Sequence, residues 1–371
     1  MRSRPQVPVA IAHDYLTQKG GAERVVLALS RIYPEAPIYT TLYHPEATFP
    51  DFTGRTIVTS ALNAVPPFRA DHRSALPLLA SASRSVRIPA EVTIASSSGW
   101  AHGFRSAGKM LVYCHNPARW LYQTDEYLGE AGPRSPKRLA VRALGPALRR
   151  WDRSAAARAD RYLANSAVVR ERVARTYGID ADVVPPPPGL DHAGHQSVHP
   201  ELRDWEGSDF WMVVSRLLPY KNVDLAIDAF RGRPDRLVVV GAGPEREALM
   251  ADLPDNVRIV SGISDAELRW LYARARGLVA PSLEDFGLTP IEANSWGLPV
   301  VARRGGGYLE TVVDGRTGIF FDTLDADSLR AALDRALDTP WQPAVLKEHA
   351  RRFGEERFAD RIRAEVEALR G

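Results

Sequence analysis

The stretch Trp-Met-Val-Val-Ser-Arg-Leu-Leu-Pro-Tyr-Lys-Asn, residues 211–222, runs from an apolar segment through a turn into a helical segment. Its first part is short and rich in β-branched residues, as expected of a buried strand. Similar runs follow, each separated from the next by a helical segment, and this alternation predicts βαβ units with a parallel sheet. The further strands predicted in this half are Arg236–Val240, Val257–Val260, Gly277–Ala280, Pro299–Ala302 and Gly318–Phe321.

A similar series of strands precedes this stretch. These strands are predicted at Val7–Ala12, Pro37–Thr41, Val92–Ser96, Met110–Cys114 and Arg161–Ala164. Between the two series lie four consecutive prolines and a glycine, Pro185–Gly189, which fit neither a central strand nor a helix interior. We therefore predict an α/β protein of two doubly wound, Rossmann-like domains. The boundary is placed in the loop after the prolines, giving domains 1–195 and 196–352.

Composition supports a two-domain globular protein. The chain has 371 residues, of which 45% are hydrophobic and 25% charged. Cys114 is the only cysteine, so no intramolecular disulfide can form, which fits a reducing compartment. The apolar run that begins at Val7 stops at His13 and Asp14, too early for a signal-peptide core, and no stretch approaches the ~20 apolar residues of a membrane span. A soluble or peripheral protein is expected.

Positive charge is concentrated in two segments although the net charge is only +3. Arg134–Arg161 contains nine Lys or Arg against two Asp, and Pro66–Arg87 contains four Arg against Asp71, with leucines between them. These segments are either solvated helix faces or a surface for anionic partners such as lipids.

In the first domain, two features could carry chemistry. Gly20 and Gly21 follow the first strand and open a helix, so backbone N–H groups there could approach a phosphate. His115 follows the strand at Met110–Cys114, and Pro117 disfavours helical geometry at Asn116, so His115 is predicted at a strand-end turn. Both features also have a purely structural interpretation.

In the second domain, Arg216 and Lys221 are predicted at a strand-to-helix junction, where two cations could neutralise a diphosphate. The sequence Gly241–Pro244 predicts a tight strand-to-helix turn. The stretch Gly262-Ile263-Ser264-Asp265 begins a helix, with Ser264 or Asp265 as the N-cap.

The strongest local signal is Glu-Asp-Phe-Gly-Leu-Thr-Pro-Ile-Glu-Ala, residues 284–293. Glu284 is predicted in a loop at a strand end, and Glu292 just inside the next helix. The backbone N–H groups of Gly287 and Leu288 form another possible anion site. The alternative is an acidic loop followed by a first-turn glutamate that complements the helix dipole.

Together these residues resemble glycosyltransferase family 4, in particular its mannosyltransferase-like branch, over nearly the whole chain. The segments that carry the resemblance are Ala12–Val25, Tyr113–Tyr122, Ser215–Lys221 and the pair Glu284 and Glu292. Gly305-Gly306-Gly307 with Glu310 also match the family's second-domain loops. The resemblance implies the retaining GT-B fold, with parallel sheets facing an interdomain cleft, and a C-terminal helix, 353–371, that returns to the first domain.

The resemblance also implies roles for individual residues. The donor diphosphate is expected at Gly20, Gly21, Arg216 and Lys221, the donor hexose at Glu284 and His115, and the ribose at Glu292. Ile263, Phe286, Gly287 and Leu288 complete the expected donor-binding set. His115, Glu284, Arg216 and Lys221 are the expected catalytic residues.

The implied reaction is transfer of a hexose, with GDP-mannose as the expected donor, onto a glycan or lipid-linked acceptor in cell-envelope polysaccharide biosynthesis. It needs no pair of acid and base carboxylates, because the departing diphosphate takes the acceptor proton; a glycoside hydrolase requires such a pair. No metal or cofactor and no nucleic-acid partner are expected. The expected location is cytoplasmic, with possible peripheral contact at the inner face of an anionic membrane. The alternatives are a nucleotide-sugar epimerase or hydrolase on this fold, a UDP-sugar-dependent transferase, and a silent sugar-nucleotide binding protein.

Overall fold

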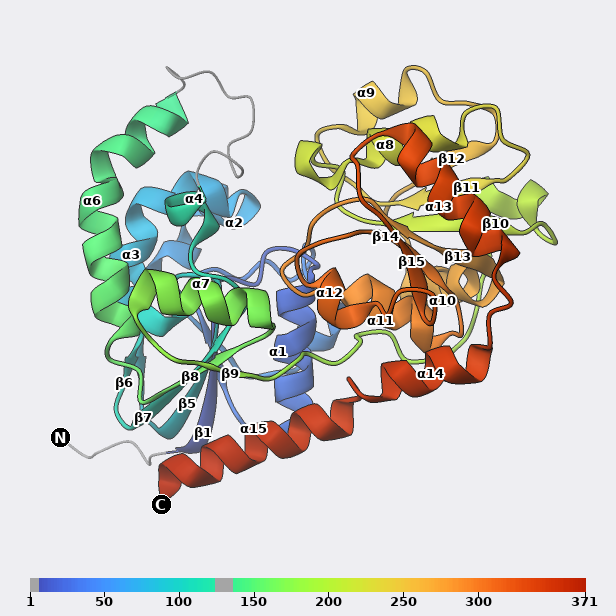
Figure 1. Ribbon diagram of the computed structural model, residues 1–371. Coiled ribbons are helices and arrows are strands. Elements are labelled where there is room, and N and C mark those ends of the chain that lie inside the picture. Colours follow the sequence, from blue (N-terminus) through green and yellow to red (C-terminus); the bar gives the residue numbers. More distant parts are fainter. Residues whose placement is uncertain (1–6, 124–135) are drawn as a thin grey trace. The chain divides into compact units, whose positions relative to one another are not determined.

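The computed structural model describes residues 7–123 and 136–371 and divides the chain into two compact units (Figure 1). The first unit comprises the chain up to Pro187 and the C-terminal segment Glu355–Gly371, and the second comprises Pro188–Gly354. Each unit contains a parallel β-sheet, which confirms the predicted fold class of two α/β domains.

The first unit is built on a seven-stranded sheet in the order β3-β2-β1-β5-β7-β8-β9, with every neighbouring pair parallel. The strand order places β1, β5 and β7 side by side at its centre. The strands of this sheet are β1 (Val7–His13), β2 (Ile38–Thr40), β3 (Ile57–Thr59), β5 (Ala90–Ser97), β7 (Lys109–Cys114), β8 (Arg161–Ala164) and β9 (Asp182–Val183). A small separate ladder pairs β4 (Arg87–Ile88) with β6 (Arg105–Ser106).

Helices cover both faces of this sheet. Alternate residues of the central strands point to opposite faces, so Ile11 and Ala10 belong to different core clusters. One face packs against α1 and α15, and the other receives α7 and the end of α6. The helices of this unit are α1 (Gly21–Ile32), α2 (Pro66–Ala70), α3 (Leu76–Ser85), α4 (Arg119–Tyr122), α6 (Pro136–Ala156), α7 (Ala167–Tyr177) and α15 (Glu355–Arg370).

The second unit is built on a six-stranded parallel sheet in the order β12-β11-β10-β13-β14-β15. Its strands are β10 (Phe210–Val214), β11 (Leu237–Val240), β12 (Val257–Val260), β13 (Ala275–Ala280), β14 (Val300–Arg303) and β15 (Gly318–Phe321). β10 and β13 are central, so the loops that follow them meet at the middle of the sheet's carboxyl edge.

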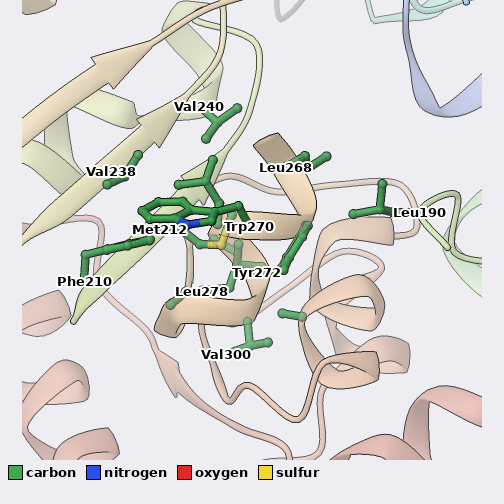
Figure 2. Close-up of a cluster of buried hydrophobic side chains, with 14 of the residues drawn as sticks. Leu190, Phe210, Met212, Val238, Val240, Leu268, Trp270, Tyr272, Leu278 and Val300 are labelled. Carbon is green, nitrogen blue, oxygen red and sulfur yellow. The ribbon is translucent and has the colours of Figure 1, made fainter. Parts of the chain in front are cut away.

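Both faces of this second sheet are also buried. One face packs against α8 and α13. The other forms a cluster that includes Tyr308 and also Trp270 and Tyr272, which Figure 2 labels. The helices of the unit are α8 (Val223–Phe230), α9 (Arg246–Met250), α10 (Asp265–Arg274), α11 (Leu288–Ser295), α12 (Tyr308–Thr311), α13 (Ala326–Asp338) and α14 (Pro343–Arg351).

The division between units falls between Pro187 and Pro188, earlier than the boundary after residue 195 given by the sequence analysis. The reason is packing, because Leu190 is buried in the core of the second unit and Val198 lies against the same cluster. At the other end, Phe353 packs against Phe286 of the second unit, so the returning segment starts at Glu355 rather than at 353. Phe358, Ile362 and Val366 of α15 are then buried in the core of the first unit.

Candidate functional site

In the first unit, the turn after β1 brings Gly20 to the start of α1. Gly20 is the N-cap residue with extended backbone, and Gly21 is the first helical residue. A Cβ on Gly20 would lie 2.6 Å from Oε2 of Glu23, so the glycine permits the buried carboxylate to pack directly against the turn. The helix start therefore has the small residues that the sequence predicted, together with an acid beneath them that it did not assign.

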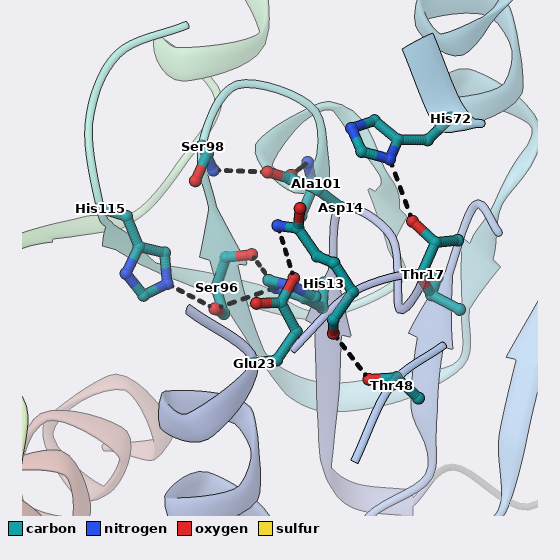
Figure 3. Close-up of polar contacts among 12 residues, drawn as sticks. His13, Asp14, Thr17, Glu23, Thr48, His72, Ser96, Ser98, Ala101 and His115 are labelled. Atoms are coloured by element: carbon teal, nitrogen blue, oxygen red, sulfur yellow. Dashed lines mark hydrogen bonds and ion pairs between the residues drawn. The ribbon is translucent and has the colours of Figure 1, made fainter. Parts of the chain in front are cut away.

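His115 lies directly after β7, at the carboxyl edge of the sheet, as predicted. Its backbone N–H donates to the carbonyl of Ser97, and its Nε2 lies 2.7 Å from Oγ of Ser96 on β5. Ser96 also contacts the buried His13, whose Nδ1 is 3.0 Å from the Ser96 carbonyl oxygen and 3.1 Å from Oγ (Figure 3). The histidine that the sequence singled out is thus the half-buried end of a chain of polar contacts that runs from Glu23 through His13 and Ser96.

The inner end of this chain is the pair formed by His13 and Glu23. Nε2 of His13 lies 3.6 Å from Oε1 of Glu23, and both side chains are almost completely buried. Burial alone lowers the pKa of His13, but the hydrogen bond and charge of Glu23, the charge of Asp14 and the Ser96 carbonyl together raise it above its ordinary value. The contact with Glu23 thus favours the protonated form of His13 beneath the glycine turn.

Asp14 fixes the loop that follows β5. Its carboxylate accepts hydrogen bonds from the backbone N–H groups of Ser98, Trp100 and Ala101, at 2.6, 3.0 and 2.6 Å. A side chain that satisfies three buried donors holds a loop in one conformation. Asp14 is therefore a structural residue at this edge.

In the second unit, Lys221 and Glu284 form an ion pair at the carboxyl edge of the sheet. The Nζ of Lys221 donates to Oε1 of Glu284, and the Oγ of Ser282 donates to the same oxygen at 2.7 Å. Lys221 ends a short 3₁₀ helix after β10, while Glu284 lies in the loop between β13 and α11. Two residues 63 positions apart are thus brought together because β10 and β13 are neighbours.

Glycines hold the loop that carries Glu284. The backbone N–H of Gly307 donates to the Glu284 carbonyl at 2.8 Å, and a Cβ on Gly306 would lie 2.5 Å from that oxygen. Gly287 caps α11 with φ +94°, and a Cβ there would lie 2.6 Å from the ring of Tyr308. The Gly305–Gly307 stretch therefore positions the acidic loop.

A second glycine pair supports the loop that carries Arg216. A Cβ on Gly241 would lie 1.8 Å from the Ser215 carbonyl oxygen, and one on Gly243 would lie 2.1 Å from that of Leu217. Arg216 itself follows β10 by two residues, is exposed, and donates to the hydroxyl of Tyr220 at 3.1 Å.

Glu292 is more enclosed than the sequence indicated. It lies in α11, is 6% exposed, and accepts hydrogen bonds from the backbone N–H of Gly189 at 3.3 Å and from the hydroxyl of Tyr272 at 3.1 Å. Both carboxylate oxygens therefore have protein partners, and Glu292 also ties the connector after the prolines to the second unit.

The other expected donor-binding residues differ in whether their side chains are buried or accessible to a ligand. Phe286 is buried against Ile291 and Phe353, so only its backbone is available to a ligand. Leu288 is the first residue of α11 and packs on the same cluster. Ile263 is half-buried against the core before α10, whose N-cap is Ser264 with a reciprocal bond to Glu267.

Sequence reasoning missed the residues that support the site. Ser96 carries no motif of its own, and His13 and Glu23 were included only within the segment Ala12–Val25 that carries the family resemblance, without a role. The register of the parallel sheet pairs His13 with Ser96, and it is this pairing that assembles the contacts. In the part of the chain that the structure describes, no group of three or more His, Cys, Asp or Glu is arranged to hold a metal.

The chain has two Rossmann-like units. The first carries a glycine turn at the edge of its sheet, and the second carries the Lys221–Glu284 pair at the edge of its own sheet. This arrangement is that of the GT-B glycosyltransferases. Family models match both units: "Glycosyltransferase Family 4" over residues 19–193 and "Glycosyl transferases group 1" over residues 198–356. The chain belongs to glycosyltransferase family 4.

Relatives with similar sequences agree with this assignment. The GDP-mannose-dependent α-(1-6)-phosphatidylinositol monomannoside mannosyltransferase of Mycolicibacterium smegmatis is 34% identical over 205 residues, 49% of this chain and 54% of that protein. A D-inositol 3-phosphate glycosyltransferase of Segniliparus rotundus is 32% identical over 58% of this chain and 54% of its own length. The matches thus span about half of each of these relatives.

Solved structures show the same fold. Sucrose-phosphate synthase from Thermosynechococcus elongatus superposes with a TM-score of 0.72 at 19% identity, covering 98% of this chain and 99% of that one. HepE of Anabaena in complex with UDP-glucose superposes with a TM-score of 0.68 at 16% identity, covering 97% and 99%.

Proposed function

We propose that this protein is a retaining hexosyltransferase that uses a nucleotide diphosphate sugar, with GDP-mannose as the donor, and a glycan or lipid-linked acceptor. The observation that carries the proposal is the buried Lys221, paired with Glu284 at the carboxyl edge of the second sheet. A cation placed there can bind a donor phosphate, and a carboxylate beside it can bind sugar hydroxyls. Glu292, eight residues further on, is assigned to the ribose.

In the proposed reaction, the bond between the anomeric carbon and the diphosphate oxygen breaks, and a bond from that carbon to the acceptor oxygen forms on the same face. The acceptor's proton passes to the departing diphosphate. Arg216, Lys221 and the backbone N–H groups at the helix starts stabilise the negative charge that develops on the leaving group. This assignment gives the protein's cations the role that a metal plays in other transferases, so we predict activity without one.

The mannose assignment rests on similarity to the mycobacterial mannosyltransferase. UDP-glucose is the competing donor, because HepE was solved in complex with it and shares the fold. The two are separated by thermal shift with GDP-mannose, UDP-glucose, UDP-N-acetylglucosamine and UDP-galactose. Stabilisation by UDP-sugars and none by GDP-mannose would contradict the donor assignment.

Turnover assays test the reaction class. We expect slow consumption of donor alone, faster transfer when an acceptor is supplied, retention of anomeric configuration in the product, and full activity in EDTA. Rapid hydrolysis or epimerisation of donor alone would favour the epimerase or hydrolase alternative. Donor binding without turnover in any acceptor mixture would favour the silent binding protein.

We also propose peripheral contact of the first unit with an anionic membrane. Leu78 of α3 and Leu144 of α6 are 45% and 42% exposed, and Arg149, Arg150 and Arg153 on α6 are exposed as well. Apolar side chains among arginines suit a surface that lies on acidic lipid. Leu79, by contrast, is fully buried in the core. Arg134, the first residue of the basic segment, lies outside the described residues.

A cluster of arginines next to these helices supports the same proposal. Partial burial, together with the charges of Arg84 and Arg105, lowers the pKa of Arg158 from its ordinary value, so two further positive charges act on this guanidinium group. Like charges held together in this way are stabilised by an anionic partner. In the described part of the chain, no helix is both long and apolar enough to cross a bilayer.

A further inference from the structure

The contacts around Ser96 determine which atoms carry hydrogens. Nδ1 of His13 faces the backbone carbonyl of Ser96, which can only accept, so Nδ1 must carry a proton. Nε2 of the same ring faces the carboxylate of Glu23. That contact also needs one proton, either on the imidazole or on the acid. His13 and Glu23 therefore share one proton, and this proton makes the contact between Nε2 and the carboxylate attractive.

The direction of the next contact follows from this assignment. Because Nδ1–H of His13 points toward Ser96, the Oγ of Ser96 can accept from it at 3.1 Å. In the described part of the chain, the remaining partner of Oγ is Nε2 of His115 at 2.7 Å. The hydroxyl proton is thus donated to His115, and Nε2 of His115 is an acceptor.

We propose that Glu23, His13 and Ser96 are positioning residues that hold His115 as the neutral tautomer protonated on Nδ1. The proposal rests on the proposed function, in which His115 contacts the donor sugar. With its Nε2 lone pair occupied and its Nδ1 protonated, His115 donates a hydrogen bond to a sugar oxygen and cannot remove a proton from the acceptor. The proton is then left for the departing diphosphate to take, as same-face transfer requires.

The side chains of Glu23, His13 and Ser96 are held in place because they are buried. His13 and Glu23 are 2% and 1% exposed, and Ser96 is fully buried. Oε1 of Glu23 additionally accepts from Nε2 of Gln18 at 3.1 Å. Oε2 has no hydrogen-bond partner among the described residues and lies against the Gly20 turn. An unbalanced carboxylate in this position would repel a diphosphate, so the proton held between His13 and Glu23 also keeps the turn electrically neutral.

The first test reads the tautomer directly and needs no substrate. The full-length protein, labelled with ¹⁵N-histidine, gives long-range ¹H–¹⁵N spectra at neutral pH, in which the His115 signals are those lost in His115→Gln. We expect a protonated-type Nδ1 and an unprotonated-type Nε2. A ring protonated only on Nε2, or on both nitrogens, would overturn the proposal.

The second test removes the Ser96 hydroxyl, which connects His13 with His115. In Ser96→Ala we expect the Nδ1–H preference to disappear and kcat to fall roughly tenfold, about the worth of one buried hydrogen bond, while the KM for donor stays within about twofold. Ser97→Ala is the matched control. The Oγ of Ser97 is also buried, but it contacts Asp14 and His102 and not the two histidines His13 and His115. Full kcat in Ser96→Ala, or the same tautomer change in Ser97→Ala, would refute the role of Ser96.

The third test uses pH. The groups facing His13 are Glu23 from α1, the adjacent Asp14, Ser96 from β5 and, with ring centroids 6.5 Å apart, His115 after β7. Loss of the shared proton places a lone pair against a carboxylate, so we expect kcat to fall at alkaline pH. In Glu23→Gln the amide can donate to His13 without that proton, and the alkaline limb should vanish. Persistence of the limb would contradict the proposal.

Failure of this inference is distinguishable from failure of the proposed function. If His115→Gln transfers sugar at the normal rate while the wild-type tautomer is as expected, the sugar contact is wrong and the positioning by Ser96 stands. If His115→Gln is inactive but the tautomer is the opposite one, the proposed site stands and the positioning chain is wrong.

Discussion

At the scale of single residues, the site depends on charges held at sheet edges. Lys221 is recognisable in the sequence because it follows a strand and a proline. Glu284 is recognisable as well, but its contact with Lys221 is not, because that contact depends on β10 and β13 being neighbours. The contacts of Ser96 with His13 and His115 likewise depend on β1, β5 and β7 being neighbours. The contact of Glu23 with His13 depends instead on the packing of α1 against the sheet.

Lys221→Met should lower kcat/KM by about 100- to 1,000-fold, as loss of one charge-stabilising donor does in other enzymes. It should also weaken binding of the bare nucleoside diphosphate in calorimetry. The exposed Lys347 on α14 offers a matched control, Lys347→Met, expected to behave as wild type. Normal diphosphate affinity in Lys221→Met would remove this residue from the site.

Arg216→Ala should act in the same direction, since its guanidinium is assigned to the same diphosphate.

Glu284→Gln and Glu292→Gln should separate hexose from nucleotide recognition. In the first variant turnover should fall far more than affinity for bare nucleotide, because Glu284 is assigned to the hexose. In the second, bare-nucleotide affinity should fall as well, because Glu292 is assigned to the ribose. Melting temperatures are needed beside the affinities, since Glu292 also binds Gly189 and Tyr272. Equal effects on bare nucleotide would refute the separate roles.

His13 gives the fold a pH dependence of defined sign. Its pKa is raised on folding, so the native state holds its proton more tightly than the unfolded chain. The resulting stability is fully present below the ordinary histidine pKa of about 6.5 and is lost as pH rises through the native value. Urea unfolding of wild type and His13→Asn at pH 6 and pH 9 should give a smaller difference between the proteins at pH 9. A difference that grows with pH would contradict the assignment.

At the scale of elements, strands with continuous apolar runs were predictable. β8, β12 and β15 occupy the predicted residues, and the other predicted strands differ by one or two residues at their ends. β3 and β9 were missed because they are edge strands of three and two residues, partly exposed, and carry no apolar run to distinguish them from loops. α11 begins at Leu288, so that Pro290 lies in its first turn, because Gly287 adopts the left-handed conformation that caps the helix.

Gly287→Ala tests how strictly this cap is specified. The substitution places a Cβ on a left-handed backbone and against the ring of Tyr308, so we expect a loss of about 1–3 kcal/mol in unfolding free energy. Gly178→Ala is the control. It has a comparable φ of +69° as the residue after α7 but nothing within 4 Å of its Cβ, so the strain is present without the clash. Equal losses in the two variants would show that Tyr308 adds nothing.

At the scale of the whole molecule, the sequence indicated two α/β units, and the comparisons placed the chain in its family. Several features of the chain's organisation lay outside local pattern. Leu190 belongs to the second unit although it directly follows the proline run, because it packs in that core. α15 belongs to the first unit although it ends the chain, because Phe358 and Ile362 fill its core. Amphipathic periodicity shows that a helix has an apolar face, but it does not name the partner.

Membrane contact is the last property that we predict at this scale. Wild-type protein should co-sediment with vesicles containing phosphatidylserine at low salt and release at high salt, because attraction of about 1 kcal/mol per cation near the surface is screened by ions. Leu78→Ser should weaken the binding if that side chain enters the interface. Leu324→Ser is matched to it, since Leu324 of the second unit is 46% exposed against 45% for Leu78. No pelleting at low salt would contradict the prediction, and binding unaffected by salt but lost in Leu78→Ser would assign the attraction to leucine insertion instead of charge.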